Sequence, residues 1–174
     1  RFAEHKVKTL PPLDGFIFKK GSPSCGIYKV PVVDNKTGMR KRNGVGLFAR
    51  AFKDKYPQVP TEDEGRLNDK AIRENFLERV YAHYRWRQIT ESQNPLQSFR
   101  AFHKNYKLIL MAKDNCAYRE LGRIVATTNR QNYDENKQVY FCQFMLAMSK
   151  IPTHGHHVNV MMHILGYLKD HLNK

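Results

Sequence analysis

The stretch Phe16-Ile17-Phe18-Lys19-Lys20-Gly21-Ser22-Pro23-Ser24-Cys25-Gly26 decides how the first half of this chain folds. Its first three residues are apolar and predict a short buried strand, and the glycine- and serine-rich residues after them predict a loop. In open α/β folds, ligands bind in the crevice beyond the carboxyl ends of the strands. We therefore expect this loop, with its cysteine and two serine hydroxyls, to lie at a functional site.

The residues that follow continue an α/β pattern. Residues 27–33 are strand-like, and Gly44-Val45-Gly46 leads into a short helix that begins at Leu47. A brief strand is predicted at residues 56–60, and Thr61 with Glu64 has the form of a helix capping box. A longer helix then runs to about Arg87, with apolar residues at every fourth position.

The pattern changes to helices alone after residue 90. Asn94 followed by Pro95 is typical of a helix start, and four apolar stripes with helical spacing lie between Pro95 and the C-terminus. We therefore predict an α/β portion over residues 1–90 and an all-α helical domain over residues 91–174.

The composition points to a polyanionic partner. The chain has 174 residues, and 30 Lys and Arg against 16 Asp and Glu give a formal net charge of +14. Nucleic acid is the commonest partner for such a surface, although an acidic protein is an alternative and some proteins are simply basic. No apolar run is long enough to cross a membrane. Three cysteines without paired spacing favour a reducing compartment, so we expect a cytoplasmic protein.

Cys25 has three possible roles when the residues are considered alone. Its sulfur can be a nucleophile, a metal ligand or a buried structural group at a strand end. One cysteine does not hold an iron–sulfur cluster or a structural zinc, which need three or four ligands.

The same loop resembles the signature of the thiouracil desulfidase family, also known as domain of unknown function 523. Gly46-Leu47-Phe48-Ala49, the run from Glu62 to Asp69, and Arg73-Glu74-Asn75-Phe76 are similar to the later part of the long form of that family. The resemblance implies removal of sulfur from thiolated uracil by a 4Fe–4S cluster held by three cysteines. It implies that Cys25 is one cluster ligand, and that Ser22 and Ser24 bind the base or relay a proton in catalysis.

The resemblance also implies that the family's two other cysteine ligands and an acidic catalytic residue precede this sequence. Cys116 and Cys142 match none of the ligand positions. We therefore expect the intact protein to carry the cluster, and this chain alone to carry none and to be inactive.

The second half resembles the YbgA-type helical domain, also known as domain of unknown function 1722. The matching segments are residues 102–112, residues 118–123 and residues 157–167. This domain follows the desulfidase domain in fused polypeptides, which implies a 4-thiouridine substrate within tRNA and a helical part that holds the RNA. We also expect the domain to continue beyond Lys174.

Two groups of polar residues in the helical half are candidates for contacting nucleic acid. Residues at one-turn spacings in the last helix share a face, and basic residues on earlier helices form a second face. For both groups the alternative is an ordinary structural or solvated helix face, and for the last helix a metal site is a further alternative. The candidates are Arg100, His103, Lys104, Lys107, Arg119, Arg123, His156, Asn159, His163 and Tyr167.

The sequence thus predicts part of an iron–sulfur-dependent tRNA thiouridine desulfidase whose helical domain binds RNA. A non-catalytic module that binds RNA or DNA is the alternative, and a module that docks on an acidic protein is a third possibility.

Overall fold

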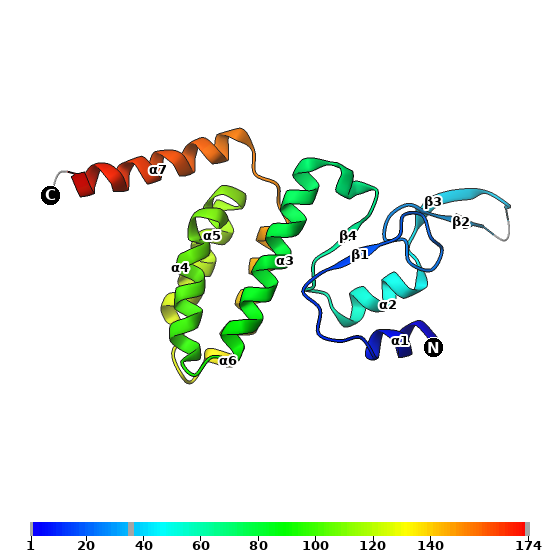
Figure 1. Ribbon diagram of the computed structural model, residues 1–174, viewed down its shortest axis with the longest axis horizontal. Coiled ribbons are helices and arrows are strands. Elements are labelled where there is room, and N and C mark those ends of the chain that lie inside the picture. The colour runs from blue at the N-terminus through cyan, green and yellow to red at the C-terminus, as the bar shows by residue number, and fades with distance from the viewer. Residues whose placement is uncertain (1, 35–36, 173–174) are drawn as a thin grey trace. The chain divides into compact units, whose positions relative to one another are not determined.

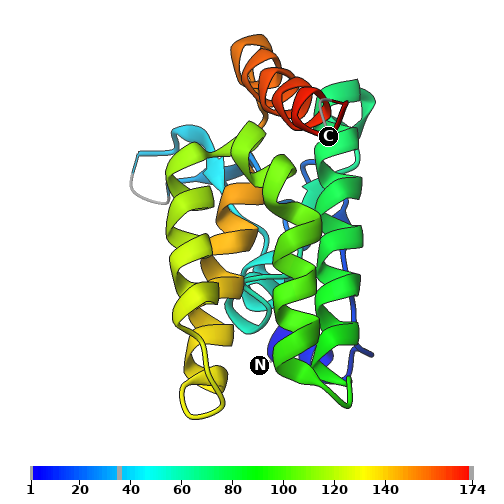
Figure 2. The same cartoon turned by 90° about the vertical axis from the view of Figure 1, so that its left-hand side faces the viewer.

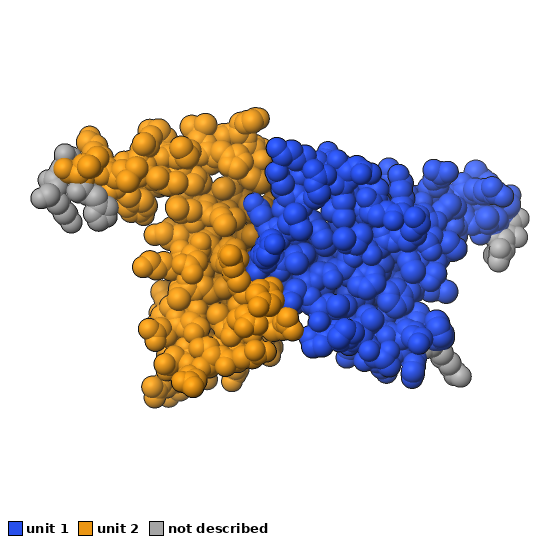
Figure 3. All heavy atoms as spheres, in the orientation of Figure 1, with its two compact units in different colours: residues 1–83 blue, residues 84–174 orange. Residues whose placement is uncertain are grey.

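The computed structural model describes residues 2–34 and 37–172. The chain forms two compact units, residues 1–83 and residues 84–174, which Figure 3 colours separately. The division falls inside the long helix α3 (Lys70–Thr90), ahead of the domain boundary predicted after residue 90, which stays a prediction. Each unit is described by itself below.

The first unit contains two small pairs of strands with helices beside them (Figure 1). β1 (Phe16–Phe18) pairs in parallel with β4 (Thr61–Asp63), with Phe18 opposite Asp63. β2 (Val30–Val33) and β3 (Arg40–Gly44) form an antiparallel hairpin. The remaining elements are α1 (Phe2–Lys8), α2 (Leu47–Lys55) and a short 3-10 helix, η1 (Arg66–Asn68).

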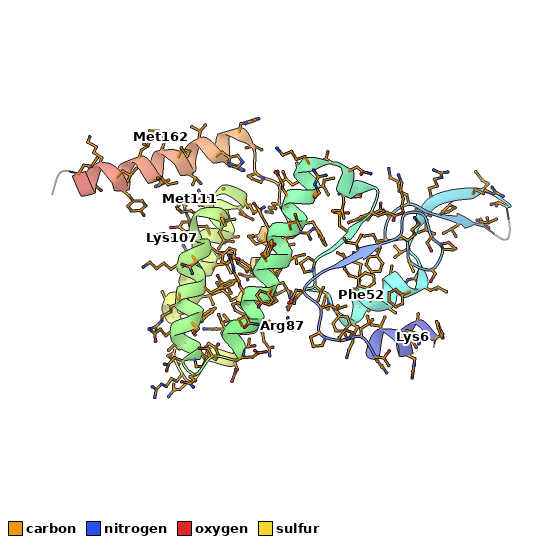
Figure 4. The ribbon with its side chains drawn as sticks, viewed as in Figure 1. Lys6, Phe52, Arg87, Lys107, Met111 and Met162 are labelled. Carbon is orange, nitrogen blue, oxygen red and sulfur yellow. The ribbon has the colours of Figure 1, made fainter. Side chains whose placement is uncertain are left out.

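The core of this unit lies between β1 and the two short helices. Phe18 and Phe52 are almost fully buried, with ring centroids 5.5 Å apart in an edge-to-face arrangement, which aromatic pairs prefer. Val7 from α1 and Ala49 from α2 complete the same buried cluster. Figure 4 labels Phe52 within this group of rings. This packing fixes the end of β1, from which the Cys25 loop begins.

The second unit is helical, as predicted. It contains α4 (Pro95–Lys113), α5 (Asn115–Thr127), α6 (Tyr133–Met148) and α7 (His154–Leu172). Figure 2 shows α4, α5 and α6 side by side, with α7 across one end of them. The core is aromatic: Trp86 stacks on Phe141 at 4.6 Å, and Tyr140 and Phe144 are fully buried beside them. The predicted fold class, an α/β portion followed by helices, is therefore confirmed.

Several local predictions were wrong, and they fall together around β4. Residues 57–59 form a turn, and Thr61 begins a strand where a helix cap was expected. Residues 61–63 pair with β1, which is distant in sequence. This pairing overrides the local capping-box pattern, because it holds the segment as a strand. Helix α3 is capped by Asp69, whose Oδ1 accepts a hydrogen bond from the Ile72 amide at 3.0 Å.

Two elements were not predicted at all. α1 is short, and β3 reads Arg-Lys-Arg-Asn-Gly without the apolar alternation typical of a strand. β3 forms because β2 offers it a partner across a hairpin. The predicted turn between them includes Asn35 and Lys36, which lie outside the described residues. No helix in the described part of the chain is long and apolar enough to span a membrane.

Candidate functional site

The Cys25 loop is a turn held by its own first residue. The Ser22 hydroxyl oxygen accepts hydrogen bonds from the amides of Ser24 at 3.3 Å and Cys25 at 3.1 Å. The Ser22 carbonyl accepts a third from the Gly26 amide at 2.7 Å. The oxygen atoms of Ser22 thus serve as acceptors that shape the loop. The hydroxyl proton of Ser22 remains available for donation to a substrate.

The loop is anchored to the start of α2 by backbone hydrogen bonds. The Ser24 carbonyl accepts from the amides of Phe48 at 2.9 Å and Ala49 at 3.4 Å, which belong to the first turn of the helix. A Cβ built on Gly46 would lie 2.3 Å from that carbonyl oxygen, so only glycine permits this approach. The glycine run that precedes the helix at Leu47 therefore has a specific role, because Gly46 lets the Cys25 loop lie against the start of α2.

The thiol of Cys25 is half-buried at the edge of the aromatic core. Its sulfur lies 3.7 Å from the Ser24 hydroxyl oxygen. The three residues proposed for chemistry, Ser22, Ser24 and Cys25, are therefore brought together in one turn at the carboxyl end of β1. Their catalytic and binding roles stay predictions.

The residues of this chain do not complete the cluster site that the resemblance implies. Cys25 is the one cysteine in the first unit, and Cys116 and Cys142 are exposed on helices of the second unit. Within the part of the chain that the structure describes, no group of three His, Cys, Asp or Glu side chains is arranged to hold a metal. A cluster held by three cysteines would need two thiolates from outside these residues.

In the helical unit, the two groups of candidate residues, one on the last helix and one on the earlier helices, come into contact. The ammonium of Lys107 on α4 lies 5.3 Å from the ring centroid of Tyr167 on α7, within the range of a cation–π interaction. Figure 4 labels Lys107 on α4, which packs against α7. Proteins that bind single-stranded nucleic acid combine such groups, because an aromatic ring stacks on a base and a lysine contacts the phosphate backbone.

Three candidates on α7 line one open hollow. Asn159, His163 and Tyr167 surround a depression of about 340 Å³, with Asp170 at its edge. All three are exposed, and His156 is exposed in the first turn of the same helix. The hollow is shallow, so it suits a stacked group more than an enclosed ligand.

The remaining basic candidates divide into exposed and engaged residues. Lys104, Arg119 and Arg123 are exposed on α4 and α5. Arg100 is exposed too, but its guanidinium donates a hydrogen bond to the Thr128 carbonyl at 3.2 Å. His103 is turned inward, with Nδ1 3.1 Å from the Tyr140 hydroxyl, and burial together with the charge of Lys107 lowers its pKa. His103 thus faces the interior of the helical unit, and its contact with the Tyr140 hydroxyl gives it a structural role.

Sequence reasoning missed a charged cluster beside the Cys25 loop. Glu62 is buried in the middle of β4, and its Oε1 accepts a hydrogen bond from Arg66 Nε at 2.8 Å. The Arg66 guanidinium in turn lies 4.9 Å from the ring centroid of Tyr28, in the segment that follows Cys25. Glu62 raises the pKa of Arg66 through their hydrogen bond. The available signal was the acidic run at residues 62–64, which the sequence interpretation assigned to a helix start.

Comparisons with known proteins confirm both resemblances. Residues 1–64 match the family described as 2-thiouracil desulfurase, and residues 107–174 match a family described as a protein of unknown function, DUF1722. The chain is 27% identical over 108 residues to a protein of Escherichia coli (strain K12) called "Uncharacterized protein YbgA". The aligned part is 62% of this chain and 64% of that relative, so the chain spans just under two thirds of its length. No solved structure matches the chain. Residues 1–64 are thus similar to 2-thiouracil desulfurases, and the second half is similar to the YbgA-type domain.

Proposed function

We propose that this chain is part of an iron–sulfur-dependent desulfidase that acts on thiouridine in tRNA, and that its helical unit binds the RNA. The observation that carries this proposal is the Cys25 loop, which presents a half-buried thiol and a serine hydroxyl 3.7 Å apart at the end of β1. The match of residues 1–64 to the 2-thiouracil desulfurase family supports the reaction class.

The role proposed for this chain's own residues is binding and positioning. Cys25 supplies one thiolate to a cluster whose other ligands come from outside the described residues. Ser24 is exposed beside the sulfur and offers a hydroxyl to the thiolated base. Ser22 keeps the loop in shape through the two amide hydrogen bonds that its oxygen accepts.

The helical unit is proposed to hold the RNA. The net charge of +14 and the contact between Lys107 and Tyr167 support this role. Lys104, Arg119 and Arg123 add exposed positive charge on the neighbouring helices α4 and α5.

The decisive experiment uses the full-length polypeptide that contains this chain. The protein is reconstituted anaerobically with iron and sulfide and incubated with tRNA that carries 4-thiouridine, and the nucleosides are then analysed by mass spectrometry. We expect thiouridine to be converted to uridine, and Cys25→Ala to abolish the conversion. Cys142→Ala is the matched control, because Cys142 is exposed on α6, and it should leave the conversion intact. Unchanged tRNA with a cluster-loaded protein would refute the proposal.

A non-catalytic nucleic-acid-binding module is the second candidate, and the contact between Lys107 and Tyr167 favours it independently of Cys25. It predicts binding of unmodified RNA with a steep salt dependence and no change in the nucleosides. The same mass-spectrometric assay, combined with an RNA-binding titration, separates the two functions.

A further inference from the structure

The hairpin of β2 and β3, residues 30–44, buries almost none of its side chains. Along β2 only Val30 is buried, and the first four residues of β3 are all exposed. Figure 1 shows the two strands extending from the rest of the first unit, paired with each other. A two-stranded ribbon without an apolar face is marginally stable by itself, so core packing does not explain this segment.

Three consecutive cations open β3, and they are Arg40, Lys41 and Arg42. Among the residues that the structure describes, none of the three forms an ion pair with a carboxylate. Asp34 is the one acidic residue of the hairpin, and its Oδ1 accepts a hydrogen bond from the Thr37 amide at 3.3 Å, which shapes the turn. Neighbouring like charges repel each other, so a polyanion that lies against this strand would stabilise it.

The register of the hairpin places the two arginines together. Successive residues of a strand point to opposite faces, so Arg40 and Arg42 share one face and Lys41 lies on the other. The residues paired with the two arginines are Val33 and Pro31, which carry no compensating charge. Arginines two residues apart on a strand are separated by about 6.8 Å along the backbone. Each guanidinium can therefore bind a different phosphate of one nucleic-acid strand through paired donors.

A strained lysine lies at the base of the same hairpin. Lys29 is exposed and has a φ of 51°, in the left-handed region that favours glycine and asparagine. In the described part of the chain, it is the one residue other than glycine with a positive φ. Lysine adds a positive charge at a position where glycine would fit with less strain, and strained residues gather at functional sites.

We propose that this hairpin is a phosphate-binding surface that lies against the backbone of RNA, with Arg40 and Arg42 as its main contacts and Lys29 at its base. The choice of RNA rests on the proposed function, because a desulfidase that acts on tRNA has to hold the RNA near the unit that carries Cys25. The surface itself rests on the exposed cations and on their register in β3. Contacts to phosphates carry no sequence information, so binding at the hairpin is independent of the base sequence.

The test uses this chain and an unmodified, fluorescein-labelled tRNA, with binding followed by fluorescence anisotropy over a series of salt concentrations. The variant combines Arg40→Gln with Arg42→Gln, which keeps two polar side chains and removes both charges. We expect it to bind at least threefold more weakly than the wild type and to lower the slope of log K against log salt by about two. Circular dichroism should show an unchanged or higher melting temperature, because two neighbouring like charges have been removed.

Arg50→Gln combined with Lys53→Gln is the matched control. Both residues are exposed on α2 in the same unit, so this variant loses the same net charge outside the hairpin. It should keep the salt slope of the wild type. Equal slopes for the hairpin variant and the wild type, or an equal loss in the control, would overturn the hairpin as the binding surface.

Poly-L-glutamate tests the other class of polyanion. If the hairpin variant loses binding to poly-L-glutamate but binds tRNA as the wild type does, the hairpin docks on an acidic protein and the assignment to RNA is refuted. The desulfuration assay is a separate readout. A tRNA that binds through the hairpin but keeps its thiouridine refutes the proposed reaction, whereas converted tRNA together with wild-type binding by the hairpin variant refutes this surface alone.

Discussion

Replacing Gly46 by alanine tests whether the close approach of the Cys25 loop to α2 shapes the site. The added Cβ would lie 2.3 Å from the Ser24 carbonyl oxygen and 2.8 Å from the Cys25 amide nitrogen. Ordinary contact begins at 3.4 Å, so the loop has to move by roughly 1 Å. The obstacle is purely one of space, because Gly46 has φ −62° and ψ 148°, which alanine adopts without strain.

The cost follows from the hydrogen bonds that such a shift stretches. Ser24 accepts from Phe48 and Ala49, and Gly26 accepts from the Gly46 amide at 2.7 Å. At about 1 kcal/mol for each of these bonds, their loss destabilises the unit by about 3 kcal/mol. The lower chain entropy of alanine in the unfolded state offsets up to about 1 kcal/mol, which leaves about 2 kcal/mol. For a unit of this size that lowers the melting temperature by roughly 10 °C.

Two measurements on the same protein check this prediction. Circular dichroism reports melting, and thiol labelling followed by peptide mass spectrometry reports access to each cysteine. We expect Cys25 to be labelled faster in the variant, with Cys116 and Cys142 unchanged because they are already exposed. Trp86, the single tryptophan, belongs to the helical unit, so its fluorescence transition should not move.

Gly166→Ala is the control for a glycine without close neighbours. It lies in α7, a Cβ there meets nothing within 4 Å, and alanine favours a helix, so stability should be unchanged or slightly higher. A Gly46→Ala protein with wild-type melting and wild-type Cys25 labelling would refute the close-approach argument.

Three further predictions concern the helical unit. Trp86→Ala removes the ring that stacks on Phe141, and urea unfolding should show a loss of about 3–5 kcal/mol in the free energy of unfolding. Because burial lowers the pKa of His103, the unfolded state binds the proton more readily, so stability is present above the ordinary histidine pKa and falls as the pH drops through it. His103→Gln should flatten this acid-side loss in thermal melts between pH 7 and pH 5, and an unchanged pH profile would contradict the assignment. Lys104→Gln and Arg119→Gln should each reduce the salt slope of RNA binding by about one, whereas Glu135→Gln, an exposed change on α6, should not reduce it.

The sequence alone determined the division into an α/β part and a helical part, because hydrophobic periodicity is a local property of the chain. The stripes of the helical half predicted α4 to α7, and Phe16-Ile17-Phe18 predicted β1 at its observed bounds. The sequence also predicted the loop from Ser22 to Gly26, because glycine and serine residues directly after a strand indicate that the strand has ended at the edge of the sheet. The family resemblances rest on the same short motifs, and the comparisons confirm them.

Tertiary structure alone decided which segments distant in sequence meet. Thr61-Glu62-Asp63 is a strand only because β1 offers it an edge, and that pairing brings Glu62 and Arg66 to the Cys25 loop. The contact of Lys107 with Tyr167 and the inward turn of His103 likewise depend on how α4 packs against its neighbours. The sequence shows which side chains share one helix face, but packing between helices decides whether that face is covered, because the free energy of burial comes from the partner surface.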